Sequence, residues 1–174
     1  MIGRKDISMP VTGKIDRKYM AHYIDAGSLC GGLTPKFERL GKDLEEYNIE
    51  LNPDTETSKN ILGESTFKHN GYEVSSDADP FYADTTSDLF TALQKIVDGR
   101  LKDDNLKTKA VEVHLWTEAT AGKYEAYQQD CYVVPTSYGG DTSGYQIPFT
   151  VNYVGERTKG KFDISSGTFT ADSE

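Results

Sequence analysis

Apolar and polar residues alternate at every second position along much of this chain, which predicts a mostly β protein. The clearest alternation runs from Tyr145 to Tyr153, with apolar side chains at the odd-numbered positions. A second run covers Val111 to Trp116, and an apolar stretch covers Cys131 to Val134. We expect two further strands nearer the N-terminus, at Tyr19 to Ile24 and at Tyr47 to Leu51.

Glycine and proline positions predict where these strands turn or break. The pair Asn70-Gly71 suits the positive φ angles of a type I′ turn, so we expect a hairpin between segments 64–69 and 72–76. Pro148 cannot donate to a sheet ladder, which favours an edge strand or a bulge. Gly155 and Gly160 predict a turn before a last strand that begins near Phe162.

One segment has helical rather than strand periodicity, from about residue 87 to 98. Its apolar positions recur with the spacing of one helix face and are Leu89, Phe90, Leu93, Ile96 and Val97. Thr86 or Ser87 can cap its start, and Gly99 is expected as the left-handed residue at its end. The predicted fold class is therefore mostly β: an antiparallel sandwich or barrel of the kind that carries one covering helix.

Length and charge narrow the function. A chain of 174 residues fits a single domain, which we place at 18–174 behind an N-terminal arm at 1–17 that lacks either standard period. The chain has 19 Lys and Arg against 28 Asp and Glu, a net charge of -9, so tight binding of nucleic acid through a basic footprint is disfavoured. It has neither a signal-peptide pattern nor an apolar run long enough to span a bilayer, so we expect no membrane partner and synthesis in the cytosol.

Candidate catalytic and binding motifs are weak. The glycines and lysines from Gly155 to Lys161 approach phosphate-loop spacing, but Phe162 stands where Ser or Thr would hold magnesium, so a charged hairpin turn fits better. Asp77, Asp79 and Asp84 lack the spacing of a calcium loop and indicate a solvated acidic turn.

The remaining reactive residues do not form a familiar site. The histidines are dispersed without zinc-ligand spacing, and no serine lies in a nucleophile-elbow motif. Cys30 and Cys131, in a chain without a secretion signal, are expected to be free thiols. We therefore predict that the protein is not an enzyme and uses neither a metal nor a cofactor.

Several runs resemble one protein family, over about residues 36 to 170. Three lie in the first half: Leu40 to Glu46, Asn52-Pro53 with Lys59 to Glu64, and Asp79 to Asp84 before the helix. The most specific run is Val133 to Gly144, which continues through Gln146 to Phe149 and on to Lys159-Gly160 and Gly167 to Thr170. These runs resemble the tail-tube (major tail) proteins of phages and prophages of Gram-positive bacteria.

The resemblance implies a structural protein of the virion tail that assembles in the cytoplasm of the host bacterium. Members form hexameric rings that stack into a tube around a tape-measure protein and join tail completion proteins. DNA is expected to cross the lumen without specific binding, which an acidic wall would favour by repelling phosphates.

Exposed loops and termini are the predicted subunit contacts, because such segments often carry function on a rigid scaffold. The segments are the N-terminal arm, the turn around Pro53 to Glu56, the Tyr138 to Gly144 loop and the Thr168 to Glu174 end. The residues singled out within them are Pro53, Asp54, Thr55, Glu56, Tyr138, Gly139, Gly140, Asp141 and Phe169.

A different class of function is also open. A β-sandwich module that binds carbohydrate or mediates adhesion would use some of the 11 tyrosines as stacking platforms for sugar rings. A monomer that binds glycans would support this alternative, whereas self-assembly into rings would support the tail-tube interpretation.

Overall fold

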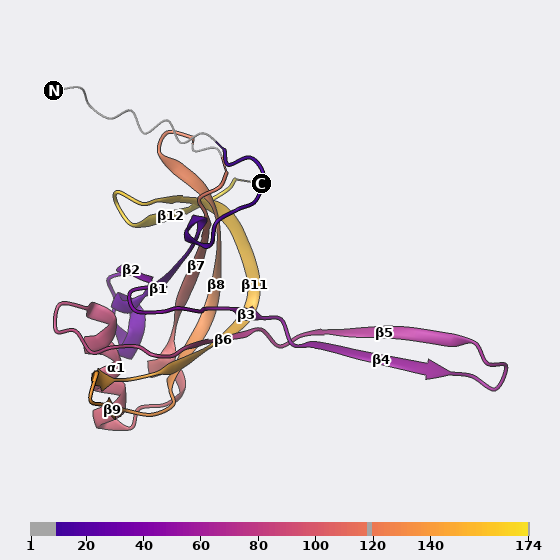
Figure 1. Cartoon of the computed structure of the whole chain (residues 1–174), viewed down its shortest axis with the longest axis horizontal. Helices are drawn as coiled ribbons and strands as arrows, with labels where there is room; N and C mark the ends of the chain where they lie inside the picture. The colour runs from indigo at the N-terminus through magenta and orange to yellow at the C-terminus, as the bar shows by residue number, and fades with distance from the viewer. Residues whose placement is uncertain (1–9, 118–119, 174) are drawn as a thin grey trace.

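The computed structural model describes residues 10–117 and 120–173, and it confirms a mostly β fold with one α-helix in that part of the chain. A curled antiparallel sheet forms a half-barrel, and a long two-stranded hairpin projects from it (Figure 1). The first nine residues of the predicted arm lie outside the described residues.

The half-barrel is one eight-stranded sheet. Its strands follow one another in the order β2 (Phe37–Leu40), β1 (Met20–Asp25), β7 (Lys107–His114), β8 (Lys123–Pro135), β11 (Phe149–Asp163), β6 (Ser75–Ala78) and β3 (Ile49–Glu50), and β12 (Thr168–Ala171) also pairs with β11. Two separate ribbons are β4 (Pro53–Lys59) with β5 (Ser65–Tyr72), and β9 (Gly139–Asp141) with β10 (Gly144–Gln146). The described residues also include short 3₁₀ helices at Arg17–Tyr19, Ala26–Gly31 and Asp103–Leu106.

The predicted helix is confirmed as α1 (Asp88–Gly99), which covers one end of the half-barrel (Figure 1). The Ser87 hydroxyl caps its start by accepting a hydrogen bond from the Phe90 amide at 3.1 Å. The prediction for its end is wrong, because Gly99 is still helical and Arg100 adopts the left-handed conformation with φ 49°. Leu89 and Leu93 are fully buried against the sheet, so the helix closes the main core.

Two apolar cores lie on opposite faces of the same sheet. Neighbouring residues of a strand point to opposite faces, and on β7 Ala110 belongs to the core under α1 whereas Val111 belongs to the second core. The second core is built around Phe162, whose ring lies 4.5 Å from that of Tyr23 and 5.8 Å from that of Phe37. Both faces of the central strands are therefore fixed by packing.

The predicted hairpin between segments 64–69 and 72–76 is wrong, because β5 pairs with β4 instead and β6 pairs with β11 and β3. Asn70-Gly71 lies within β5, next to the register shift between Asp54 and Thr55, and the turn between β4 and β5 lies at residues 60–64. The positive φ of Gly71, 126°, serves the bulge. The expected strand from Tyr47 to Leu51 is likewise reduced to the two residues of β3.

The last third of the chain also differs from the prediction. Pro148 lies between β10 and β11 and marks neither an edge strand nor a bulge. Gly155 and Gly160 do not frame a turn, because β11 continues through both and shifts register between Val154 and Thr158. Gly160 is needed for another reason: a Cβ there would overlap the backbone oxygen of Thr170 on β12.

Truncating the helix at its centre tests this packing. We expect Leu93→Ala to lower the free energy of unfolding by about 2 to 5 kcal/mol, because it leaves a cavity between α1 and the sheet. Chemical denaturation measures the change. The control is Lys95→Ala on the exposed face of α1, and an equal loss from both variants would contradict this account of the core.

Candidate functional site

The β4–β5 hairpin is exposed along almost its whole length. Every residue from 51 to 72 is exposed except Gly71, which is partly buried. Asn60 holds the turn: its Oδ1 accepts hydrogen bonds from the amides of Leu62 at 2.9 Å and Glu64 at 3.0 Å. The hairpin is thus a formed element without packing from the described part of its own chain.

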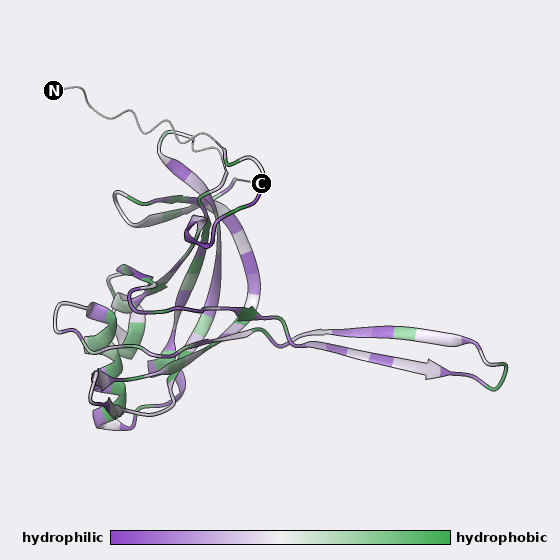
Figure 2. Ribbon diagram, in the orientation of Figure 1, coloured by the Kyte–Doolittle hydropathy of each residue, from purple (hydrophilic) through white to green (hydrophobic). Residues whose placement is uncertain are grey.

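This ribbon carries large apolar side chains into solvent. Ile61 is 103% exposed, Leu62 76% and Phe67 66%. Figure 2 shows the tip as the most hydrophobic part of an otherwise polar hairpin. An isolated two-stranded hairpin is marginally stable in water, and exposed apolar clusters mark interaction sites. The hairpin therefore has the properties of a contact element.

The structure places four predicted contact residues on this element. Pro53, Asp54, Thr55 and Glu56 all lie on β4, at the end nearest the half-barrel, and all are exposed. The expected turn at these residues is wrong, since they form a strand paired with β5. Sequence reasoning missed the tip itself, at residues 60–64, although the adjacent apolar pair in a polar run was a signal.

The Tyr138 to Gly144 segment lies elsewhere on the molecule, near α1 (Figure 1). It is not a loop: Gly139, Gly140 and Asp141 form β9, which pairs with β10. The Arg100 guanidinium donates to the Tyr138 hydroxyl at 2.8 Å, which ties this small hairpin to the end of the helix. These residues are exposed but separate from the β4–β5 hairpin.

Phe169 occupies a third place. It lies on β12 directly opposite Phe162, is half-buried, and packs against the second core. Its surroundings account for it as a core residue. The structure therefore does not bring the predicted contact residues together into one site.

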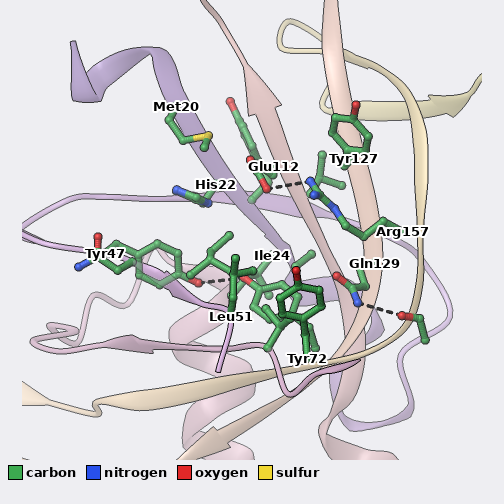
Figure 3. Close-up of a pocket in the computed structure, with 18 of the residues that line it drawn as sticks. Met20, His22, Ile24, Tyr47, Leu51, Tyr72, Glu112, Tyr127, Gln129 and Arg157 are labelled. Carbon is green, nitrogen blue, oxygen red and sulfur yellow. Dashed lines mark hydrogen bonds and ion pairs between the residues drawn. The ribbon is translucent and has the colours of Figure 1, made fainter. Parts of the chain in front are cut away.

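A groove of about 870 Å³ opens beside the base of the hairpin (Figure 3). One wall is the sheet, and the other is the pair of segments that lead into and out of the hairpin. Its lining comes from distant parts of the chain and includes Met20, His22, Ile24, Tyr47, Leu51, Tyr72, Glu112, Tyr127, Gln129 and Arg157. No local pattern in the sequence identifies such a set.

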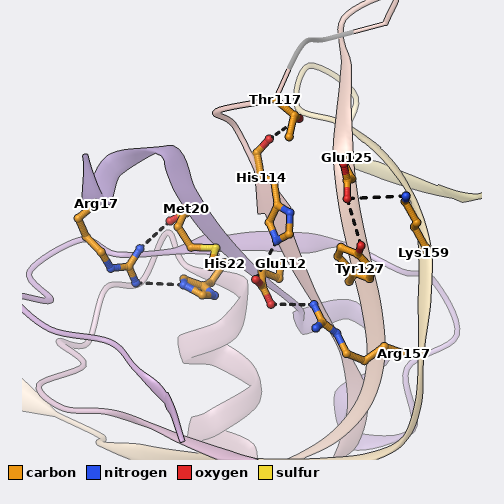
Figure 4. A network of polar contacts seen from close by, with 10 residues as sticks. All are labelled: Arg17, Met20, His22, Glu112, His114, Thr117, Glu125, Tyr127, Arg157 and Lys159. Carbon is orange, nitrogen blue, oxygen red and sulfur yellow. Dashed lines mark hydrogen bonds and ion pairs between the residues drawn. The ribbon is translucent and has the colours of Figure 1, made fainter. Parts of the chain in front are cut away.

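A charged network forms one side of the groove (Figure 4). Glu112 accepts hydrogen bonds from His114 at 2.9 Å and from Arg157 at 3.0 Å, although only 18% of its side chain is exposed. Burial raises the pKa of Glu112, but the His114 hydrogen bond and the Arg157 charge outweigh it and leave the pKa below its ordinary value. Arg157 also lies over the Tyr127 ring, 4.2 Å from its centroid.

A second polar cluster joins the N-terminal segment to the groove. Arg17 donates to the Tyr47 carbonyl at 2.9 Å and lies 3.0 Å from the His22 ring nitrogen. Burial, followed by the Arg17 charge, lowers the pKa of His22 to about 4. The described end of the predicted arm is thus docked, which the Val11 amide reinforces with a 3.0 Å hydrogen bond to the Trp116 carbonyl.

Potential metal ligands are dispersed among the described residues, and both cysteines are free. Residues 10–117 and 120–173 contain no group of three or more His, Cys, Asp or Glu side chains placed to hold a metal ion. Cys30 and Cys131 are both free, as the sequence predicts, and burial raises the pKa of each thiol, that of Cys131 to about 12.

No helix among the described residues is long and apolar enough to cross a membrane.

Comparison with known proteins adds no relative. No protein-family model matches the chain, and no curated protein matches its sequence.

Replacing His22 should change how stability depends on pH. The folded chain holds the pKa of His22 at about 4 against an ordinary value of 6.5, so the unfolded chain binds the proton more readily between these values. Stability therefore falls as pH drops from about 6.5 to 4, by up to about 3 kcal/mol from this group. We expect His22→Gln to lose less stability across that window.

Denaturation at a series of pH values measures the difference between the two chains. His69→Gln, on the exposed hairpin, is the matched control and should behave like the unmodified chain. Identical pH dependence in His22→Gln and the unmodified chain would contradict the assigned burial of His22.

Proposed function

We propose that this chain is a self-assembling structural subunit of a phage tail tube, built as stacked hexameric rings through which DNA passes. The exposed β4–β5 hairpin is the observation that carries the proposal. A ribbon of this length is expected to gain stability when another molecule covers it. A second copy of the same chain is the simplest molecule to do so.

Burial of the hairpin tip gives association a driving force. Complete burial of a side chain such as Ile61, Leu62 or Phe67 contributes about 1.5 to 3 kcal/mol. The tip and the body of the subunit are different surfaces, so such a contact is heterologous. Heterologous contacts repeat from copy to copy and build closed rings or open filaments, the two geometries that a stacked tube combines.

The edges of the half-barrel support the same proposal. The sheet path ends at β2 and at β3, and β12 pairs only with β11 among the described strands. Exposed strand edges can pair with a neighbouring chain. A sheet that continues between neighbouring subunits would give the ring a rigid wall.

Charge and family resemblance supply the remaining parts. A net charge of -9 on each subunit suits a lumen that repels DNA phosphates, so that DNA passes without specific binding. The resemblance to tail-tube proteins supports the hexamer, the tape-measure protein in the lumen and the tail completion proteins as partners. It also supports location in the virion tail.

The carbohydrate-binding alternative has less support from the geometry. Three tyrosines are exposed: Tyr72 at the hairpin base, Tyr138 against Arg100, and Tyr145 against Gln94 of α1. Tyr72 lies apart from the other two. It shares the groove with Tyr23 and Tyr47, which are buried, and with Tyr127 and Tyr153, which are half-buried, so Tyr72 alone of these five tyrosines has an exposed ring on which a sugar could stack.

Concentration-dependent assembly of the purified full chain tests the proposal. Sedimentation velocity should show conversion from subunits to large particles, and negative-stain electron microscopy should show hollow tubes with six-fold end views. A monomer at every concentration, with glycan binding, would overturn the proposal in favour of the carbohydrate-binding module.

A single charge at the tip should block assembly without unfolding the subunit. We expect Leu62→Asp to raise the concentration needed for assembly at least tenfold, because a carboxylate would have to be buried in the contact. Its thermal midpoint should stay close to that of the unmodified chain. Leu33→Asp is the matched control, since Leu33 is 96% exposed and lies outside the hairpin; equal effects of the two variants would contradict the role of the tip.

A further inference from the structure

The hairpin tip presents apolar side chains and a carboxylate that could bind to another molecule. Asn60 fixes the turn through its Oδ1 contacts and also donates from Nδ2 to the Glu64 carboxylate at 2.7 Å. This arrangement leaves the Ile61 and Leu62 side chains exposed and places the Glu64 carboxylate two residues after Leu62. The tip therefore presents an apolar pair beside a negative charge.

The groove has the complementary character. Ile49 and Val74, which are both half-buried, give it an apolar lining, and Leu51, which is 54% exposed, also lines it. Arg157 provides positive charge at the side of the groove. Arg157 contacts Glu112 through Nη2. Because a guanidinium has five N–H donors, Arg157 can also donate to a second carboxylate.

The tip cannot fill the groove of its own chain. The groove lies at the base of the hairpin, beside Leu51 and Tyr72, and the tip lies at the far end (Figure 1). The strand β4 has seven residues, which span about 23 Å at the usual rise of a strand. The hairpin points away from the groove over that distance.

We propose that the groove between the sheet and the hairpin base receives the hairpin tip of a second copy of this chain. This inference rests on the proposed function and makes it specific, because it names both halves of the contact. Ile61 and Leu62 of one copy lie against the apolar lining of the next, and Glu64 of that tip lies within reach of Arg157. Each copy offers one tip and one groove, so the contact repeats along the assembly.

A mixed-disulfide experiment tests the contact directly. Two chains are made on a Cys30→Ser background, one with Leu62→Cys at the tip and one with Leu51→Cys at the groove. Cys131 is retained because it is fully buried and its raised pKa keeps it in the unreactive thiol form. The two chains are mixed in a glutathione redox buffer, and mass spectrometry quantifies the disulfide between them.

The expected result is at least ten times more 62–51 disulfide than the matched pair in which Leu33→Cys replaces Leu51→Cys. Adding Glu64→Lys to the tip chain should reduce the yield severalfold, and high salt should weaken that difference. Equal yields from the 62–51 and 62–33 pairs would overturn the inference. The inference would also be overturned if soluble oligosaccharides protected the Leu51→Cys thiol from alkylation, because that result would assign the groove to a sugar.

Failure of this inference can be told apart from failure of the proposed function. Tubes formed by the unmodified chain together with equal disulfide yields would keep the tail-tube proposal and reject the groove as the receptor. A specific 62–51 disulfide in a chain that forms no rings or tubes would keep the contact and reject the tube.

Discussion

The ladder between β8 and β11 is the interaction on which the rest of the structure depends. It runs from the Phe149–Pro135 pair to the Asp163–Lys123 pair and joins the β2-β1-β7-β8 side of the sheet to the β11-β6-β3 side. Val133 and Val151, paired across it, face the core under α1, whereas Ala126 and Phe162 face the second core. Loss of this ladder would remove both cores together, because each face of the same two strands supports one of them.

One irregularity in that ladder shapes the groove. The register shifts between Val154 and Thr158, and the residues in the interval are free of the strict alternation of a strand. Arg157 lies in this interval and reaches Glu112 on β7, across β8. The same stretch that resembled a phosphate loop in the sequence is therefore a bulge that carries a cation to the groove, and the shift also lets β11 continue past Gly155 as a strand.

Local patterns predicted the elements whose burial follows a simple period. The helix with its Ser87 cap could be expected because it buries one regular face. The strands at Met20–Asp25 and Lys107–His114 were found from their apolar residues, although both of their faces are buried. The projecting hairpin was misplaced, because its strands are exposed on both sides and hence lack an apolar period. The groove could not be predicted, because His22, Glu112 and Arg157 meet only through the pairing of β1, β7, β8 and β11.

In the assembly that we propose, other copies of the chain cover the β4–β5 hairpin. Hydrogen exchange of the backbone amides of β4 and β5, compared between the dilute subunit and the concentrated assembly, tests it most directly. We expect rapid exchange of these amides in the dilute chain and strong protection in the assembly, with little change in the exchange of β7 and β8. An assembly in which the hairpin amides exchange as fast as in the free subunit would contradict this proposal.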